Sequence, residues 1–227
     1  MRPYVVVNVA MSADGKLSTR ERRQVKISGT DDFLRVDRLK ASSDAVMVGI
    51  GTVLADDPSL IVKSDELKRE RQAQGRDEHP ARVIVDSNAR IPLTASVLTK
   101  GAGKRVIAVT CRADPAKISK LKKMATVVVA GENEVDITTL LDELGAMGMQ
   151  KLMVEGGGTL IASLFFAGFV DEIYTFVGNI IIGGKDAPTP ADGSGFVNEA
   201  EFPRLTLVEF TQLDDGILLH WKVESGS

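Results

Sequence analysis

Residues 151–160 read Lys-Leu-Met-Val-Glu-Gly-Gly-Gly-Thr-Leu, and this stretch indicates the fold class. Its first four residues form a short apolar run, which is typical of a strand buried on both faces of a parallel sheet. Residues 159–167 are apolar nearly all round and predict a buried helix. A buried strand that enters a buried helix through a short turn is typical of α/β folds.

The glycine turn itself predicts an anion site. Three glycines allow the backbone to approach a ligand closely, and the helix that follows presents free N–H groups, most naturally to a phosphate. The spacing matches neither a Walker loop, which needs a lysine after the last glycine, nor the Gly-x-Gly-x-x-Gly dinucleotide fingerprint. The alternative interpretation is that the turn is only a tight structural connection.

Working outward from this turn, short apolar and β-branched runs recur at residues 4–9, 45–48, 82–85, 105–109, 126–129 and 173–177. Helical patterns lie between them at residues 30–41, 115–124 and 136–144. Residues 205–212 and 217–223 flank Asp214-Asp215-Gly216 and predict an antiparallel hairpin. We therefore expect one α/β domain over residues 1–227, with a mixed, mostly parallel sheet, a C-terminal antiparallel hairpin and helices on both faces.

Two stretches lack this regularity. Residues 64–78 carry many charges around almost no apolar residues and predict a solvated excursion, part helix and part loop. Residues 183–195 are rich in glycine and proline and predict a loop that covers a ligand or is partly mobile.

Composition excludes several classes of partner and site. The formal net charge is −3, which favours neither a nucleic acid nor an anionic membrane. The single cysteine, Cys111, excludes an intramolecular disulfide and a thiolate metal cluster, and it fits a cytoplasmic protein. The two histidines have no partners at metal-ligand spacing, so no metal site is expected.

Two more strand ends carry polar motifs. Residues 49–58 place Thr52 and Asp56 one helical turn apart after a predicted strand, and residues 8–16 form a Ser-Ala-Asp-Gly turn after another. Ligands in open α/β sheets bind outside the carboxyl ends of strands, so we expect these motifs to share a cleft with the glycine turn. The alternatives are that Asp56-Asp57-Pro58 only ends a helix and that the second turn is structural.

Together these stretches resemble the reductase family of riboflavin biosynthesis, which also forms the C-terminal half of bacterial deaminase-reductases. The matching segments, in the order of the family, are residues 8–16, 37–49, 51–58, 80–87, 154–159, 168–173 and 183–184. The resemblance implies a dihydrofolate-reductase-like fold, a homodimer, and hydride transfer from NADPH, with NADH as the alternative.

The resemblance also implies roles for individual residues. Those expected at the dinucleotide are Met11, Thr52, Asp56, Ser87, Gly156, Gly157, Gly158 and Thr159. Those expected at the substrate are Lys40, Leu60, Lys63 and Glu155. Glu155 and Asp56 are the carboxylates expected to assist catalysis. The family often has arginine at the positions of Lys40 and Lys63, and lysine keeps the charge but loses the bidentate geometry.

The chain has neither the His-x-Glu nor the Pro-Cys-x-x-Cys motif of a zinc deaminase, so we expect a reductase alone. The resemblance implies reduction of the ribosylamino side chain of 2,5-diamino-6-ribosylamino-4(3H)-pyrimidinone 5′-phosphate to the ribitylamino form. Three alternatives stay open: the deaminated 5-amino-6-ribosylamino-uracil phosphate as substrate, a pterin or folate reductase, and a non-catalytic nucleotide-binding module.

Overall fold

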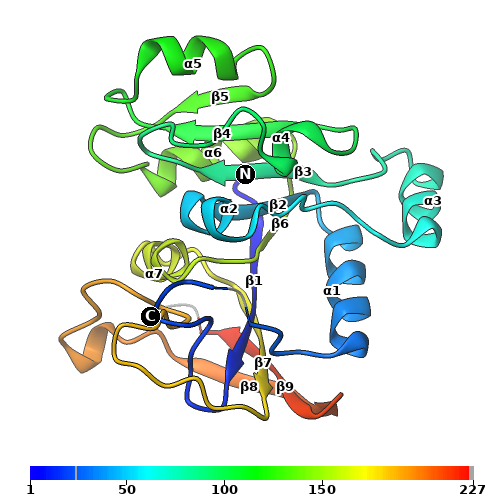
Figure 1. Ribbon diagram of the computed structural model, residues 1–227, viewed down its shortest axis with the longest axis vertical. Helices are drawn as coiled ribbons and strands as arrows, with labels where there is room; N and C mark the ends of the chain where they lie inside the picture. The colour runs from blue at the N-terminus through cyan, green and yellow to red at the C-terminus, as the bar shows by residue number, and fades with distance from the viewer. Residues whose placement is uncertain (24, 225–227) are drawn as a thin grey trace. The chain divides into compact units, whose positions relative to one another are not determined.

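The computed structural model describes residues 1–23 and 25–224, and the chain forms two compact units (Figure 1). Unit 1 contains Met1–Pro3 and Asp37–Met153, and unit 2 contains Tyr4–Val36 and Val154–Ser227. The division falls inside helix α1 (Thr30–Ser42) and at the last residue of strand β6 (Lys151–Val154).

The strands of unit 1 lie in the order β5-β4-β3-β2-β6. Besides β6, they are β2 (Ala45–Gly49), β3 (Ala81–Val85), β4 (Arg105–Val109) and β5 (Thr126–Val129). The pairs β2–β3, β3–β4 and β4–β5 are parallel. Residues 45–48, 83–84 and 106–109 are buried, which confirms that the apolar runs are strands covered on both faces.

Some helices of unit 1 begin with a side-chain cap and others begin without one. Besides the end of α1, the helices of unit 1 are α2 (Ile50–Asp56), α3 (Asp65–Ala73), α4 (Ser96–Thr99), α5 (Pro115–Leu121) and α6 (Ile137–Ala146). Asp136 caps α6 by accepting a hydrogen bond from the N–H of Thr139. In Figure 1, α4 lies in front of the strands of unit 1 and α6 lies behind them. Helix α4 connects β3 to β4, and α6 connects β5 back to β6 in the opposite direction along the sheet, so right-handed connections place the two helices on opposite faces.

The strands of unit 2 lie in the order β1-β7-β9-β8. They are β1 (Tyr4–Ser12), β7 (Glu172–Gly178), β9 (Gly216–Val223) and β8 (Leu205–Leu213). Strands β1 and β7 are parallel, and β9 is antiparallel to both β7 and β8, so the predicted hairpin is confirmed. Asp214 in the hairpin turn accepts hydrogen bonds from the N–H groups of Gly29, Asp31 and Asp32 and thereby caps the start of α1.

Unit 2 also holds helix α7 (Gly158–Phe166) and the short helix η1 (Glu199–Glu201). Leu160, Ile161 and Leu164 of α7 are buried, as the apolar pattern predicts. Among the described residues, no helix combines the length and the apolar composition that a membrane span requires.

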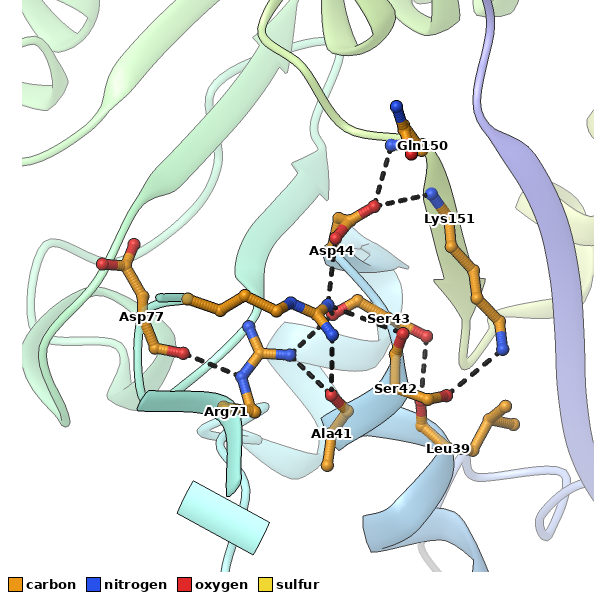
Figure 2. A network of polar contacts seen from close by, with 10 residues as sticks. Leu39, Ala41, Ser42, Ser43, Asp44, Arg71, Asp77, Gln150 and Lys151 are labelled. Atoms are coloured by element: carbon orange, nitrogen blue, oxygen red, sulfur yellow. Dashed lines mark hydrogen bonds and ion pairs between the residues drawn. The ribbon is translucent and has the colours of Figure 1, made fainter. Parts of the chain in front are cut away.

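The prediction of a solvated excursion at residues 64–78, part helix and part loop, is confirmed for the helix but is wrong for one buried side chain. Residues 65–73 form α3, and Arg71 on this helix is only 4% exposed. Its guanidinium donates hydrogen bonds to the carbonyl oxygens of Ala41, Ser43 and Asp77 (Figure 2). Two of these three acceptors, Ala41 and Ser43, lie about 30 residues away in the sequence, so the local charge pattern does not reveal the burial of Arg71.

Candidate active site

The glycine turn follows β6 as the sequence predicts, and it leaves the start of α7 without a side-chain cap. Val154 is buried, Glu155 is half-buried, and Gly156 adopts a φ of 120°, which favours glycine. The peptide bond between Gly156 and Gly157 is cis. Gly157 is the N-cap residue of α7 and has no side chain that could cap the first turn of the helix. An oxyanion at this end would meet the N–H groups of the first turn and the positive end of the helix dipole.

Gly158 is a glycine because the protein itself occupies the space around it. A Cβ atom at this position would lie 2.3 Å from the carbonyl oxygen of Thr189 and 2.9 Å from a carboxylate oxygen of Asp192. The N–H of Asp192 donates to the carbonyl oxygen of Gly158, and Asp192 accepts from the N–H and the hydroxyl of Thr189. A phosphate at the start of α7 must therefore share that end of the helix with the Asp192 carboxylate.

The turn after β1 is held to the loop at residues 180–188. The Asp14 carboxylate accepts from the Ser12 hydroxyl at 2.6 Å and from the N–H groups of Ile182 and Gly183 at 3.1 and 2.7 Å. The hydrogen bond from Ser12 is the main cause that lowers the pKa of Asp14 to about 2. These contacts favour the structural interpretation of this turn. Met11, the predicted cofactor neighbour, lies half-buried one residue before Ser12.

In unit 1, the motif after β2 separates two adjacent aspartates into different roles. Asp57 is the C-cap residue of α2, with a left-handed φ of 42°, and its carboxylate accepts from the N–H and hydroxyl of Ser96. Asp57 thus ends the helix. Thr52 is half-buried and Asp56 is exposed, yet partial desolvation by the surrounding protein raises the pKa of Asp56. A carboxyl group with a raised pKa suits a proton donor.

The predicted cofactor residue Ser87 follows β3. Its carbonyl oxygen accepts from the N–H and hydroxyl of Thr110, and its own hydroxyl oxygen accepts from the N–H of Val135 at 3.3 Å. Its O–H proton can therefore still be donated to a ligand. The preceding Asp86 is fully buried and accepts from the N–H of Ile91, which fixes the turn that carries Ser87.

The predicted substrate residues Lys40, Leu60 and Lys63 all lie in unit 1. Lys40 is in the last turn of α1 and half-buried, and the Lys63 side chain is exposed. Leu60 is 3% exposed with a φ of 54°, so its side chain belongs to the core of unit 1. The backbone of Lys63 is bonded to the carboxylate of Asp37, a residue that the sequence analysis did not single out. The sequence signal that could have identified Asp37 is its position three residues before Lys40 on the same predicted helix.

A polar network holds the end of α1 in unit 1 (Figure 2). Arg76 donates to the carbonyl oxygen of Ser43 at 2.6 Å and pairs with Asp44 at 2.9 Å. Asp44 also accepts from the N–H groups of Gln150 and Lys151, at the start of β6. Together with Arg71, these contacts satisfy the carbonyl groups that the end of a helix leaves free.

Comparison with known proteins decides the family. The model of the RibD C-terminal domain matches residues 3–219 of this chain. The chain belongs to the RibD C-terminal domain family. Within it, the chain is 51% identical over 205 residues to the 2,5-diamino-6-ribosylamino-4(3H)-pyrimidinone 5′-phosphate reductase of Archaeoglobus fulgidus, covering 90% of this chain and 93% of that protein. It is 43% identical over 224 residues to the protein of the same name from Methanothermobacter thermautotrophicus, covering 99% of this chain and all of that protein (100%).

Solved structures support the same fold. Acinetobacter baumannii RibD superposes with a TM-score of 0.80 at 27% identity, over 98% of this chain and 58% of that one. The riboflavin biosynthesis reductase Rib7 of yeast superposes with a TM-score of 0.69 at 17% identity, over 98% of this chain and 90% of that one, which supports the fold alone. The dihydrofolate-reductase-like α/β fold that the resemblance implied is confirmed.

Proposed function

We propose that this member of the RibD C-terminal domain family reduces 2,5-diamino-6-ribosylamino-4(3H)-pyrimidinone 5′-phosphate to its ribitylamino form with NADPH. The observation that carries the proposal is the 51% identity to the Archaeoglobus fulgidus reductase, which extends over 93% of that protein. Two kinds of anion contact support the proposal. The glycine turn before α7 offers backbone N–H groups to the phosphates of a dinucleotide, and the exposed Lys63 of unit 1 offers a positive charge to a sugar phosphate.

The turn before α7 fits the phosphates of a nicotinamide dinucleotide. Gly156 and Gly157 bring no side chain, and the first N–H groups of α7 have no side-chain cap. We therefore keep Gly156, Gly157, Gly158 and Thr159 as predicted cofactor contacts. Thr52, Asp56, Ser87 and Met11 also stay predictions.

The proposed reaction is a ring opening followed by a reduction. The bond between C1′ and the ring oxygen breaks, the oxygen takes the proton that the glycosidic nitrogen loses, and an imine forms. When bound, NADPH supplies a hydride to C1′, and a proton returns to the nitrogen. Asp56, whose pKa is raised by desolvation, is proposed to carry one of these protons, and Glu155 is the second carboxylate that we predict to assist.

Lys40 and Lys63 are proposed to bind the 5′-phosphate of the substrate. In a chain with a net charge of −3, a phosphate dianion needs local cations. The Lys63 side chain is exposed, and among the described residues no ion pair occupies it. Leu60 is buried, so we propose that only its backbone borders the substrate.

The partner proposed for unit 2 is a second copy of the chain. Strand β8 is the edge strand of unit 2. Its residues 205–212 are exposed, and Phe210 is 69% exposed. An apolar edge strand is better paired than left in water. Light scattering at micromolar concentration should give a dimer mass, and Phe210→Lys should lower it. A monomer mass for the parent protein would overturn this part.

One substrate panel separates the proposed function from its rivals. NADPH oxidation should depend on the diamino pyrimidine phosphate, run slower with the deaminated uracil phosphate, and be absent with dihydrofolate. NADH in place of NADPH measures the choice of cofactor. Oxidation with dihydrofolate alone would favour the pterin reductase, and NADPH binding without any turnover would favour the non-catalytic module. We propose a cytoplasmic setting, which the single cysteine supports.

A further inference from the structure

Asp37 is a buried carboxylate that, within the part of the chain the structure describes, accepts side-chain hydrogen bonds from one short segment. It lies on α1 and is 7% exposed. The N–H of Lys63 donates to both carboxylate oxygens, at 2.8 and 3.1 Å, and the N–H of Ser64 donates to one of them at 2.8 Å. A buried charge persists where hydrogen bonds compensate it, and here the backbone of residues 63 and 64 provides them.

These bonds fix the backbone of Lys63 beside α1 and leave its side chain outside. Lys40 lies three residues after Asp37, on the neighbouring turn of the same helix face. The position of the Lys63 backbone relative to the turn that carries Lys40 is therefore set by one carboxylate.

The chain that follows Lys63 is also fixed, by contacts of α3. Ser64 caps α3 by accepting from the N–H of Leu67, and α3 carries Arg71. Figure 2 shows Arg71 reaching the carbonyl oxygens of Ala41 and Ser43 at the end of α1. Helix α3 is thus attached to α1 through Arg71, whereas Asp37 is the one residue of the described ranges 1–23 and 25–224 that accepts from the backbone N–H of Lys63.

We propose that Asp37 is a positioning residue for substrate binding: it holds Lys63 where its ammonium group can bind the phosphate of the substrate. This inference rests on the proposed function. Asp37 touches neither substrate nor cofactor in this role, and its effect passes through Lys63.

The readout is the ratio of kcat/KM for the substrate with its 5′-phosphate to kcat/KM for the dephosphorylated substrate. Asp37→Asn removes the charge and one of the two acceptor oxygens, and should lower this ratio by about three- to tenfold. Asp37→Glu keeps the carboxylate and should lower it less. The matched control is Arg76→Ala, which removes contacts of the turn after α3 with Ser43 and Asp44 but none with Lys63, and should leave the ratio unchanged.

A double-mutant cycle separates positioning from a general structural role. If Asp37 acts through Lys63, Asp37→Asn should add no further loss of the ratio in a Lys63→Ala background. Equal losses with and without Lys63, or a parent-like ratio for Asp37→Asn, would overturn the inference while leaving the reductase function intact. Should Asp37→Asn fail to fold, the same cycle is run with Asp37→Glu.

The cycle also reports on the proposed phosphate contact. If Lys63→Ala leaves the ratio unchanged, the phosphate role of Lys63 and the positioning role of Asp37 both fail. The proposed reduction then stands or falls separately, on whether the parent protein oxidises NADPH with the pyrimidine phosphate.

Discussion

The two regions proposed to hold anions are built in different ways. In unit 2, the glycine turn offers backbone N–H groups at the start of α7, with the Asp192 carboxylate beside it. In unit 1, Lys40 and Lys63 offer side-chain charge, and Lys63 is held by Asp37 from 26 residues away. The first region depends on the absence of side chains, and the second depends on their charge. Added bulk should therefore damage the first, and loss of charge the second.

The largest effect is expected at the lysines. Lys40→Ala or Lys63→Ala should cost about 1.5–3 kcal/mol of charge-assisted hydrogen bonding, roughly 10- to 100-fold in kcat/KM with the phosphorylated substrate. Part of the loss should appear in kcat, because the contact is remote from the reacting carbon. With the dephosphorylated substrate, the loss should nearly vanish. Equal losses for both substrates would show that the lysine is structural.

Bulk at Gly157 should weaken the cofactor site next. Gly157→Val places a branched side chain at the N-cap of α7 and should weaken NADPH binding by about tenfold or more, 1.4 kcal/mol. Fluorescence titration of NADPH measures the change, and thermal unfolding checks that the variant is folded. A folded variant that titrates like the parent would mean that the phosphates bind elsewhere.

Gly158→Ala sharpens the contrast within the same turn. The added methyl group meets the carbonyl oxygen of Thr189, so the loop at residues 189–192 must shift. We expect a loss of about 1 kcal/mol in the free energy of unfolding, at the lower end for an overpacked site. Urea unfolding measures it, with Gly51→Ala as the control, because a Cβ atom at Gly51 meets nothing within 4 Å. Parent-like stability would contradict the close approach of this loop.

The smallest effect concerns pH. The folded pKa of Asp14 is lowered to about 2 from 3.8, so its contribution to stability is present above the unfolded value and is lost as pH falls from about 4 to 2. Asp14→Asn should make unfolding less dependent on pH in that window. The slope of the unfolding free energy against pH gives the comparison, and an unchanged slope would show that the hydrogen bonds of Asp14 do not persist in solution.

The sequence predicted the features that depend on neighbouring residues. The glycine turn, the buried strands and the hairpin around Asp214 follow from local periodicity and turn chemistry, and all are found. The roles of Asp37 and Arg71 could not be predicted in this way. Each is a charged residue whose burial is compensated mainly by backbone groups 26 to 30 residues away, and a local charge pattern indicates only a solvated surface.

The most direct test of the proposed reaction follows the hydride. The protein is incubated with the diamino pyrimidine phosphate and NADPH that carries deuterium at both positions of nicotinamide C4. Hydride transfer from NADPH to C1′ predicts a ribitylamino product with one deuterium, located at C1′, by mass spectrometry and NMR. An unreduced ribosylamino compound, or a reduced product that carries no deuterium at C1′, would contradict it.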